Sequence, residues 1–398
     1  LAAALALTFL TASAFGATVL TINTTNDTGA GSLRDTIVRL NDVCAAGDAQ
    51  CKVTIDLPQY SSFAPHTPLP PITACGSIEI DGGHEAIEDD RLFELSGRNL
   101  TFGSGLNVRP DCSDGLRKLT ISGLAINSFP QDGISIHPTG GQYEVVLSGL
   151  FIGTDMTGRE ARANAWRGVA VTSPLATVRV ETSIVSGNGR SGVWGWDSAY
   201  VSVRASKLGV GADGRPLGNG ATGFALLRGR GDIRESVVAH NAHWGMSAVP
   251  GAYLNSSYRN SIHSNGVLGV DWGIDLQTLN ELPTAPAAPV ITSATYDAAT
   301  NKTTIRGTVR IDSIVPGSHY TVHVYSNSSL NARGFVEGER WEWSSTPLFP
   351  QGQTGTFNWE VVVFDRDLRG LILSAMTALG HWDFPSHTSS ELSHPFSA

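Results

Sequence analysis

Residues 164–171 read Asn-Ala-Trp-Arg-Gly-Val-Ala-Val, and residues 188–195 read Asn-Gly-Arg-Ser-Gly-Val-Trp-Gly. Both stretches contain Asn, three residues of any type, Gly and an apolar residue. This pattern occurs five times, beginning at Asn164, Asn188, Asn219, Asn241 and Asn265. Gly133-Ile134 resembles an earlier copy that lacks the asparagine. The spacing of about 22–24 residues, with two longer copies, is typical of solenoid repeats.

Within each copy, apolar and polar residues alternate over two short runs, such as Val178–Glu181 and Gly168–Val171. Alternation with a period of two predicts β-strands. Short strands with no helical pattern between them exclude βαβ units and favour the stacked rungs of a parallel β-helix. The apolar residues would then form inward columns, one of which is Ile134, Val169, Val193, Phe224, Met246 and Val270.

The repeated asparagines are predicted to form a structural turn ladder. Asparagine tolerates unusual turn dihedrals, and its amide can bond to the turn of the neighbouring rung. A role as sugar ligands is the alternative. The two longer copies contain similar stretches, Ile152–Gly158 and Leu208–Gly214, which predict matching insertions on one side of the stack.

The composition favours a turn-rich β protein. Charged residues make up 16% of the chain, glycine occurs 44 times, and the formal net charge is −9. A net negative charge argues against nucleic acid as a partner. Residues 1–14 are almost wholly apolar and end in Ala12-Ser13-Ala14, which predicts part of a secretory signal peptide, or alternatively a buried strand. No stretch is long enough to predict a membrane span.

The chain contains four cysteines, Cys44, Cys51, Cys75 and Cys112. An even number in a secreted chain favours disulfides, and three pairings are possible. We favour Cys44–Cys51 with Cys75–Cys112, because the first pair would close a short polar loop. No Cys-x-x-Cys motif is present, and no other motif indicates a metal or an organic cofactor, so we expect neither.

The remaining organisation follows from local signals. Ser32–Asp35 predicts a helix N-cap, and Leu33, Ile37 and Leu40 would share one face of a short capping helix. Prolines between 283 and 289 indicate a stiff linker, and alternating runs beyond it predict a β-sandwich. The predicted boundaries are a signal peptide at 1–14, a cap region at 15–66, a β-helix at 67–282, a linker at 283–289 and a sandwich at 290–398.

Residues 25–35, Thr-Asn-Asp-Thr-Gly-Ala-Gly-Ser-Leu-Arg-Asp, resemble the start of secreted β-helix proteins with a CSLREA-type N-terminal region. Leu69–Ile72, Ile80–Gly82, Asn265–Asp271 and the final Thr388–Ser393 are similar to segments of the same group. The resemblance implies an all-β fold, a right-handed, pectin-lyase-like parallel β-helix followed by an immunoglobulin-like β-sandwich. It implies no particular activity, because related folds include lyases, hydrolases, esterases and non-enzymes.

Two sets of outward residues are candidates for chemistry. Arg204 and Arg234 are predicted to stack on successive rungs with Glu181, where arginines could bind uronate carboxylates. The alternative is a solvated ladder in which Glu181 pairs with Arg204. Glycoside hydrolysis needs two carboxylates facing one bond, and Asp271 lies near Asp275 at the last coil. The other residues expected in the Asp271 column are mostly small, which favours a sheet face that carries no cluster of catalytic carboxylates.

Tryptophans cluster near the repeat glycines, and Trp194 and Trp196 would share the outward face of one strand. Exposed indoles stack on the apolar faces of sugar rings, so both are candidate carbohydrate contacts; burial in the core is the alternative. The sequence thus supports three hypotheses. The protein binds polysaccharide or a cell-surface partner without catalysis, it is a polysaccharide lyase or glycoside hydrolase, or it self-associates as an adhesive protein.

Overall fold

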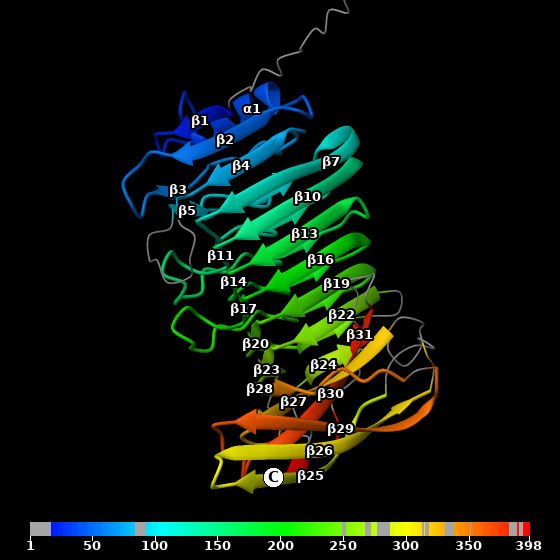
Figure 1. Cartoon of the computed structure of the whole chain (residues 1–398). Helices are drawn as coiled ribbons and strands as arrows, with labels where there is room; N and C mark the ends of the chain where they lie inside the picture. Colours follow the sequence, from blue (N-terminus) through cyan, green and yellow to red (C-terminus); the bar gives the residue numbers. More distant parts are fainter. Residues whose placement is uncertain are drawn as a thin grey trace, which may run out of the picture.

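The computed structural model describes residues 17–83, 93–248, 252–266, 272–276, 287–312, 314, 318–330, 338–350, 352–381, 388–389 and 393–398. Its first part is a solenoid of three parallel sheets, and its second part is a β-sandwich at the solenoid's C-terminal end (Figure 1). The predicted signal peptide at 1–14 lies outside the described residues, as does most of the predicted linker.

Sheet A contains the longest solenoid strands, and neighbouring strands pair in parallel. Its strands are β1 Thr18–Ile22, β2 Gln50–Ile55, β4 Ser77–Asp81, β7 Asp111–Ser122, β10 Gly140–Ser148, β13 Ala176–Glu181, β16 Ser198–Arg204, β19 Gly229–Arg234 and β22 Ala252–Tyr258. The parallel sheet therefore begins well before residue 67, the predicted boundary of the β-helix. The physical reason is that the cap-region strands β1 and β2 carry the same apolar alternation as later rungs.

Sheets B and C consist of shorter strands. Sheet B contains β3 Ser62–Phe63, β5 Phe93–Ser96, β8 Leu124–Asn127, β11 Phe151–Ile152, β14 Ile184–Val185, β17 Lys207–Leu208, β20 Val237–Ala239 and β23 Ser261–His263. Sheet C contains β6 Leu106–Val108, β9 Ile134–Ile136, β12 Val169–Val171, β15 Val193–Gly195, β18 Phe224–Leu226, β21 Trp244–Ala248 and β24 Trp272–Leu276. The chain passes from A to B to C and back, so the predicted right-handed parallel β-helix is confirmed.

The solenoid core is built from columns of buried apolar residues. In sheet A one column is Leu20, Val53, Ile80, Ile121, Leu147, Val180, Val203 and Ile233. In sheet C the predicted column holds from Ile134 to Met246. Its last described member is Ile274 rather than Val270, because Met246 pairs with Ile274 and the connection after Asn265 is longer than in earlier copies.

The repeated asparagines form a buried ladder between sheets B and C. The side-chain amide of Asn164 donates to Asn188 Oδ1 at 3.0 Å, and the same bond continues through Asn219, Asn241 and Asn265. Each amide also donates to a backbone carbonyl of the preceding sheet B strand, such as Val185 O for Asn219. The ladder thus satisfies turn backbone that water cannot reach.

A second ladder lies at the turn from sheet A to sheet B. Ser183 N donates to Ser206 Oγ, Ser206 N to Ser236 Oγ, and Ser236 N to Asn260 Oδ1, each at 3.0–3.1 Å. All four side chains are buried. Each of the preceding residues Thr182, Ala205, Glu235 and Arg259 has a positive φ, which turns the chain sharply enough to aim the next amide at its neighbour.

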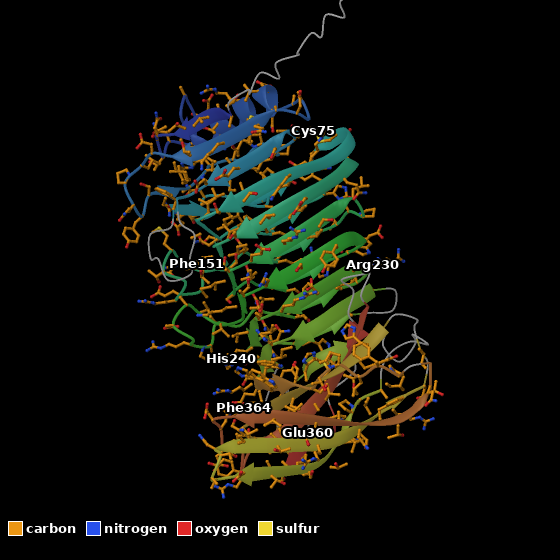
Figure 2. The ribbon with its side chains drawn as sticks, in the orientation of Figure 1. Cys75, Phe151, Arg230, His240, Glu360 and Phe364 are labelled. Carbon is orange, nitrogen blue, oxygen red and sulfur yellow. A yellow bond between two sulfur atoms is a disulfide. The ribbon has the colours of Figure 1, made fainter. Side chains whose placement is uncertain are left out.

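The two predicted insertions stack on the outer face of sheet B, and we call residues 153–162 and 209–217 the lateral lobe. Ala212 N donates to Gly158 O at 2.8 Å, which joins the two insertions. Met156 and Ala212 pack on Ala125, Phe151 and Ile184, the outward residues of this part of sheet B. Phe151 is labelled on this flank in Figure 2. The lobe therefore buries an outward face that would otherwise be apolar and exposed.

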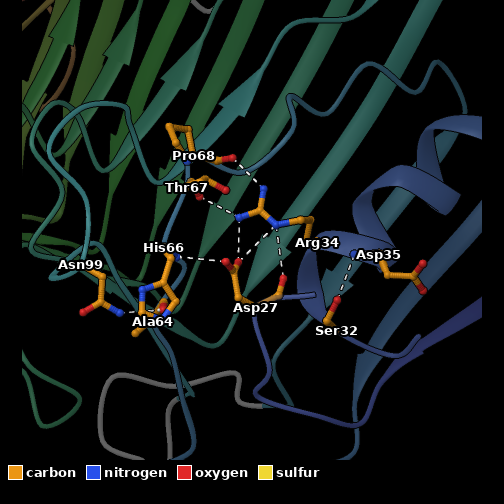
Figure 3. Close-up of polar contacts among 9 residues, drawn as sticks. All are labelled: Asp27, Ser32, Arg34, Asp35, Ala64, His66, Thr67, Pro68 and Asn99. Carbon is orange, nitrogen blue, oxygen red and sulfur yellow. Dashed lines mark hydrogen bonds and ion pairs between the residues drawn. The ribbon is translucent and has the colours of Figure 1, made fainter. Parts of the chain in front are cut away.

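The N-terminal cap is held by a charged network. Helix α1, Leu33–Val43, begins at Ser32, whose side chain accepts from Asp35 N at 3.2 Å, as predicted. Figure 3 shows the Arg34 guanidinium between the α1 turn and the chain at Thr67 and Pro68. It donates to Asp27 Oδ1 at 2.7 Å and to both of those carbonyls. The Ser-Leu-Arg-Asp stretch therefore joins the cap to the first coil.

Both predicted disulfides are present. Cys44 at the end of α1 bonds to Cys51 of β2, and Cys75 bonds to Cys112 of β7. The first pair ties the capping helix to the sheet that it covers. The second ties the approach to β4 to a later sheet A strand, in the upper part of Figure 2, where Cys75 is labelled.

The second part of the chain is the predicted β-sandwich. One sheet contains β25 Val290–Asp297, β26 Lys302–Ile311 and β29 Gly355–Phe364, and the other contains β27 Ser318–Asn327, β28 Arg340–Ser344, β30 Ile372–His381, β31 Thr388–Ser389 and β32 Phe396–Ser397. Ile305, Val361, Val324 and Leu373 are buried between the sheets. The sandwich joins the solenoid where β31 pairs with β22 and Gly338 bridges to Ile262.

Candidate carbohydrate-binding face

Five side chains with aromatic or cationic character lie side by side on sheet C. Trp166 and Arg167 precede β12, Arg190 precedes β15, Trp194 lies in β15, and Trp196 follows it. We call these five residues the tryptophan–arginine row. They come from two successive rungs, because Val169 of β12 pairs with Val193 of β15.

Cations and indoles alternate along the row. The Arg167 guanidinium carbon lies 3.7 Å from the centroid of the Trp194 ring and 5.9 Å from that of Trp166. The Arg190 guanidinium lies 5.3 Å from the Trp166 ring. At the other end, the rings of Trp194 and Trp196 are 6.0 Å apart and tilted by 58°. Cation–π and aromatic contacts of this kind fix the ring orientations before any ligand arrives.

Arg167 is held in place by a buried carboxylate. Asp132 occupies the position before Gly133 in the preceding rung, accepts from Arg167 N at 3.0 Å and lies 3.7 Å from the guanidinium. Burial raises the pKa of Asp132, while the Arg167 backbone amide and guanidinium and the Arg190 charge oppose the rise. Burial also lowers the pKa of Arg167, against the attraction of Asp132. Asp132 and Arg167 therefore form a partly desolvated pair under the row.

The indoles stand above a flat floor. Trp194 occupies the outward position of β15, and its neighbours on either side are Ala170 and Ala225. Trp196 is 50% exposed, and Trp166 is also exposed. Both alanines are buried, so the side chains of the row, and not the sheet below, form the outer surface here. Exposed indoles offer stacking surfaces for pyranose rings, and arginines beside them offer paired donors for carboxylate or sulfate groups.

Arg204 and Arg234 occupy a different part of the solenoid. Glu181, Arg204 and Arg234 do stack on successive rungs, as the sequence predicted. The ion pair of Arg204 is with Glu235 at 3.0 Å, however, and not with Glu181. Arg234 lies 2.5 Å from the buried carboxylate of Asp232, which also accepts from the Tyr200 hydroxyl at 2.5 Å. Both arginines already hold carboxylates of the protein itself.

The structure does not bring these arginines to the tryptophans. Trp196 lies just before β16 begins at Ser198, and Arg204 is the last residue of that strand. At about 3.3 Å per residue, the two ends of β16 are roughly 20 Å apart. One sugar ring cannot contact both, so the candidate residues of the sequence divide into two separate groups.

The predicted carboxylate site at the last coil is not supported by a described pair. Asp271 lies outside the described residues. Ser247 pairs with Asp275, so the backbone register puts Asp275 at the place in the column that had been predicted for Asp271. The reason is again the longer connection after Asn265. Among the described residues, no group of three acidic, histidine or cysteine side chains could hold a metal ion.

Sequence reasoning missed Arg167, Arg190 and Asp132. A signal was available, because Asp132 and Arg167 both precede a repeat glycine by one residue, and Trp166 and Arg190 precede one by two. Equivalent positions of successive copies become neighbours in a solenoid. Aligning the copies would therefore have placed Arg167 above Asp132 and Arg190 beside Trp166.

Comparison with known proteins adds little to this description. No protein-family model matches the chain, and no curated protein matches it. Its resemblance to CSLREA-type proteins therefore stays a prediction. Among solved structures, it is similar to the full-length tailspike protein 2 of Escherichia coli O157:H7 bacteriophage CAB120, with 10% identity and a TM-score of 0.26. That match covers 87% of this chain and 59% of the tailspike, so the chain spans less than two thirds of its length.

Proposed function

We propose that this protein is a secreted β-helix protein that binds an acidic polysaccharide along the tryptophan–arginine row. The single observation that carries the proposal is the half-exposed Trp196 ring, 6.0 Å from Trp194, beside arginines that are packed on neighbouring indoles. The side chains of the row are already packed against each other in the free protein, so they lose little conformational freedom when a ligand binds.

The charge of the row favours an acidic ligand. Arg167 and Arg190 face one carboxylate, Asp132, which leaves an excess of positive charge on this part of a chain whose formal net charge is −9. Guanidinium groups bind carboxylates and sulfates with two parallel hydrogen bonds. Uronate-containing or sulfated polysaccharides combine such groups with the apolar ring faces that indoles stack on.

The cysteine pairs support an extracellular location. Both pairs are disulfide-bonded, and the described cysteines include no free thiol. Such bonds persist in oxidising compartments. In the described part of the chain, no helix has the length and apolar character needed to span a membrane.

Binding without cleavage is favoured over the lyase alternative. That alternative assigned the chemistry to Arg204 and Arg234, and both are engaged with Glu235 and Asp232. They also lie at the far end of β16 from the tryptophans, so the indoles and these arginines do not form one site. Self-association remains a separate prediction, tested by the mass of the protein in solution over a wide concentration range.

Binding to polygalacturonate and to a neutral glucan, measured by affinity electrophoresis and calorimetry, tests the proposal. We expect the protein to bind the acidic polymer, and Trp196→Ala to weaken binding roughly tenfold, which corresponds to about 1.4 kcal/mol. Trp343→Ala is the matched control. That indole lies on sandwich strand β28 and is 48% exposed, and its removal should leave binding unchanged.

Two outcomes would contradict the proposal. The folded protein binds neither polygalacturonate nor a sulfated polymer such as dextran sulfate, or Trp196→Ala and Trp343→Ala have the same effect. Release of unsaturated ends from the polymer by the intact protein would instead support the lyase alternative.

A further inference from the structure

A hollow of about 470 Å³ opens on the outer face of sheet B, on the flank where β3, β5 and β11 are labelled in Figure 1. Three segments that are distant in sequence surround it: the turn at Tyr60, strand β5 with the following Arg98, and the lateral lobe from Asp155 to Arg162. Ser128 N donates to Arg162 O at 3.1 Å, which fastens the lobe against the rung beside the hollow. Its size is within the range of small-molecule sites.

The floor of the hollow contains a carboxylate that the core does not require. Glu94 lies outward between Ser62 and Ala125 in the sheet B column, and its side chain is only 13% exposed. Ser62 Oγ donates to Oε2 at 2.5 Å, and Asn127 Nδ2 donates to Oε1 at 2.9 Å. A charge removed from water in this way is costly unless it is well paired, and Glu94 has these two donors and the nearby Arg98 guanidinium as partners.

The charges of the lining cancel, because the two carboxylates, Glu94 and Asp155, are matched by two guanidinium groups, those of Arg98 and Arg162. Arg98 lies 3.6 Å from Glu94 and also donates to Ser62 Oγ at 3.3 Å. Arg162, on the lobe, lies 3.3 Å from Glu160. The hollow therefore offers donors and acceptors without a net charge, so an anionic ligand gains no general attraction there. This differs from the tryptophan–arginine row, where positive charge is in excess.

Asp155 is the second carboxylate among the described lining residues, and its oxygens accept hydrogen bonds from residues of its own turn. Oδ2 accepts from Thr157 Oγ1 at 2.8 Å, and Oδ1 accepts from the backbone amides of Arg159 and Glu160 at 3.0 and 3.1 Å. A glycosidase needs two carboxylates that can both act on one bond. With Asp155 occupied in this way, the hollow has the groups for binding and lacks a second acting carboxylate.

Tyr60 supplies an aromatic wall. Its φ is +63°, a left-handed conformation that is rare for an aromatic residue, and its side chain is exposed at the rim. Strained backbone of this kind persists where the surrounding structure requires it and is frequent at ligand sites. Met156 adds an apolar surface from the lobe.

The geometry points to a second carbohydrate site in this hollow, specific for a neutral glycosyl residue such as a hexose or an N-acetylhexosamine. Each Glu94 oxygen accepts one hydrogen bond from the protein and keeps a second lone pair for a sugar hydroxyl. Arg98 and Arg162 donate to the sugar oxygens, and the Tyr60 ring stacks on the apolar face of the sugar. The site is on sheet B and shares no residue with the tryptophan–arginine row on sheet C, so it does not depend on the proposed function.

Calorimetric titration of the full chain with glucose, galactose, mannose and N-acetylglucosamine tests the site. We expect at least one of them to bind with millimolar affinity. Tyr60→Ala and Arg98→Gln should each weaken this binding at least tenfold. Tyr296→Ala, which removes a tyrosine of the sandwich, is the matched control and should leave the affinity unchanged.

Glu94→Gln should also abolish binding. Because this substitution also changes the contacts of residue 94 with Ser62 and Asn127, which contribute to the fold, the test is decided by Tyr60→Ala and Arg98→Gln. The two proposals are distinguishable, because Tyr60→Ala should retain polygalacturonate binding and Trp196→Ala should retain binding of the neutral sugar. The inference is overturned if none of the four sugars binds to the folded protein, or if Tyr60→Ala and Arg98→Gln keep the full affinity.

Discussion

Asn188 Nδ2 donates to Asn219 Oδ1 at 2.9 Å, and both amides are buried in the turn between sheets B and C. The same Oδ1 accepts from Asn188 N at 3.1 Å, and Asn219 Nδ2 donates to Val185 O and to Asn241 Oδ1. The Asn219 side chain thus bonds to groups of the rungs on both sides of its own. The ladder replaces the water that exposed turns would use.

Asn219→Ala should destabilise the protein by about 3 kcal/mol, because it leaves buried donors and acceptors without partners. Urea unfolding followed by circular dichroism measures the change. Asn107→Ala is the control, since Asn107 is an outward asparagine of β6 on the same solenoid, and its removal should cost less than about 0.5 kcal/mol. Equal effects of the two substitutions would show that the ladder is dispensable.

The pair of Asp27 and Arg34 should make the cap sensitive to acid. Burial acts to raise the pKa of Asp27, but the Arg34 side chain and the His66 backbone amide hold this pKa below its ordinary value of 3.8. A carboxyl whose folded-state pKa is lowered stabilises the fold above its unfolded-state pKa. That stabilisation is lost as the pH falls through the folded-state pKa.

Asp27→Asn should therefore reduce stability at neutral pH by about 1 kcal/mol and flatten the loss of stability below pH ~4. Thermal unfolding measured at successive pH values between neutral and acidic solution provides the test. A cycle with Arg34→Met separates the pair from background titration, and Asp27→Asn should have a smaller effect on the acid slope in that background, where the hydrogen bond from His66 N remains. An unchanged slope in the single variant would contradict this account.

Binding to acidic polysaccharide should depend on salt if Arg167 and Arg190 take part. Raising the ionic strength from ~0.05 to ~0.5 M shortens the screening length to a few ångströms and should weaken binding. Arg190→Gln should lower the affinity at low salt and reduce this salt dependence. Arg310→Gln, on an exposed sandwich strand, should leave both unchanged. A salt-independent affinity for polygalacturonate would mean that stacking alone accounts for binding.

The two disulfides should differ in their contribution to stability. Cys75 and Cys112 are 37 residues apart, whereas Cys44 and Cys51 are 7 apart. Loop-closure entropy then predicts losses of about 4 kcal/mol for Cys75→Ala with Cys112→Ala, and about 2.5 kcal/mol for Cys44→Ala with Cys51→Ala. Chemical unfolding of both double variants gives the order. A greater loss from the shorter loop would indicate that helix α1 depends on its bond to β2.

The repeat predicted the rungs well because a solenoid makes equivalent positions adjacent. Asn164 to Asn265 are aligned for this reason, as are Ile134 to Met246. The serine ladder at Ser183, Ser206 and Ser236 was missed, because no glycine marks its turn. Thr182, Ala205 and Glu235 take the positive φ there, and these residue types do not indicate a left-handed turn.

The candidate site was predicted only in part. Trp194 and Trp196 were identified from their parity in one strand, which is a local property. Arg167, which packs on Trp194, belongs to the preceding rung. Arg204 pairs with Glu235, which is 31 residues later in the chain. Outward contacts of this kind depend on the rung length and on side-chain direction.

The sequence by itself determined the stacked strands and the asparagine turns, because each follows from a period along the chain. It favoured the observed cysteine pairing among three possible ones, from the short spacing of Cys44 and Cys51. Only the tertiary structure decided which outward side chains meet: Trp194 with Arg167, Glu94 with Ser62, and Arg34 with Asp27. The physical reason is that outward residues are not constrained by the apolar core. Their partners are set by connections of unequal length, which shift the register between one coil and the next.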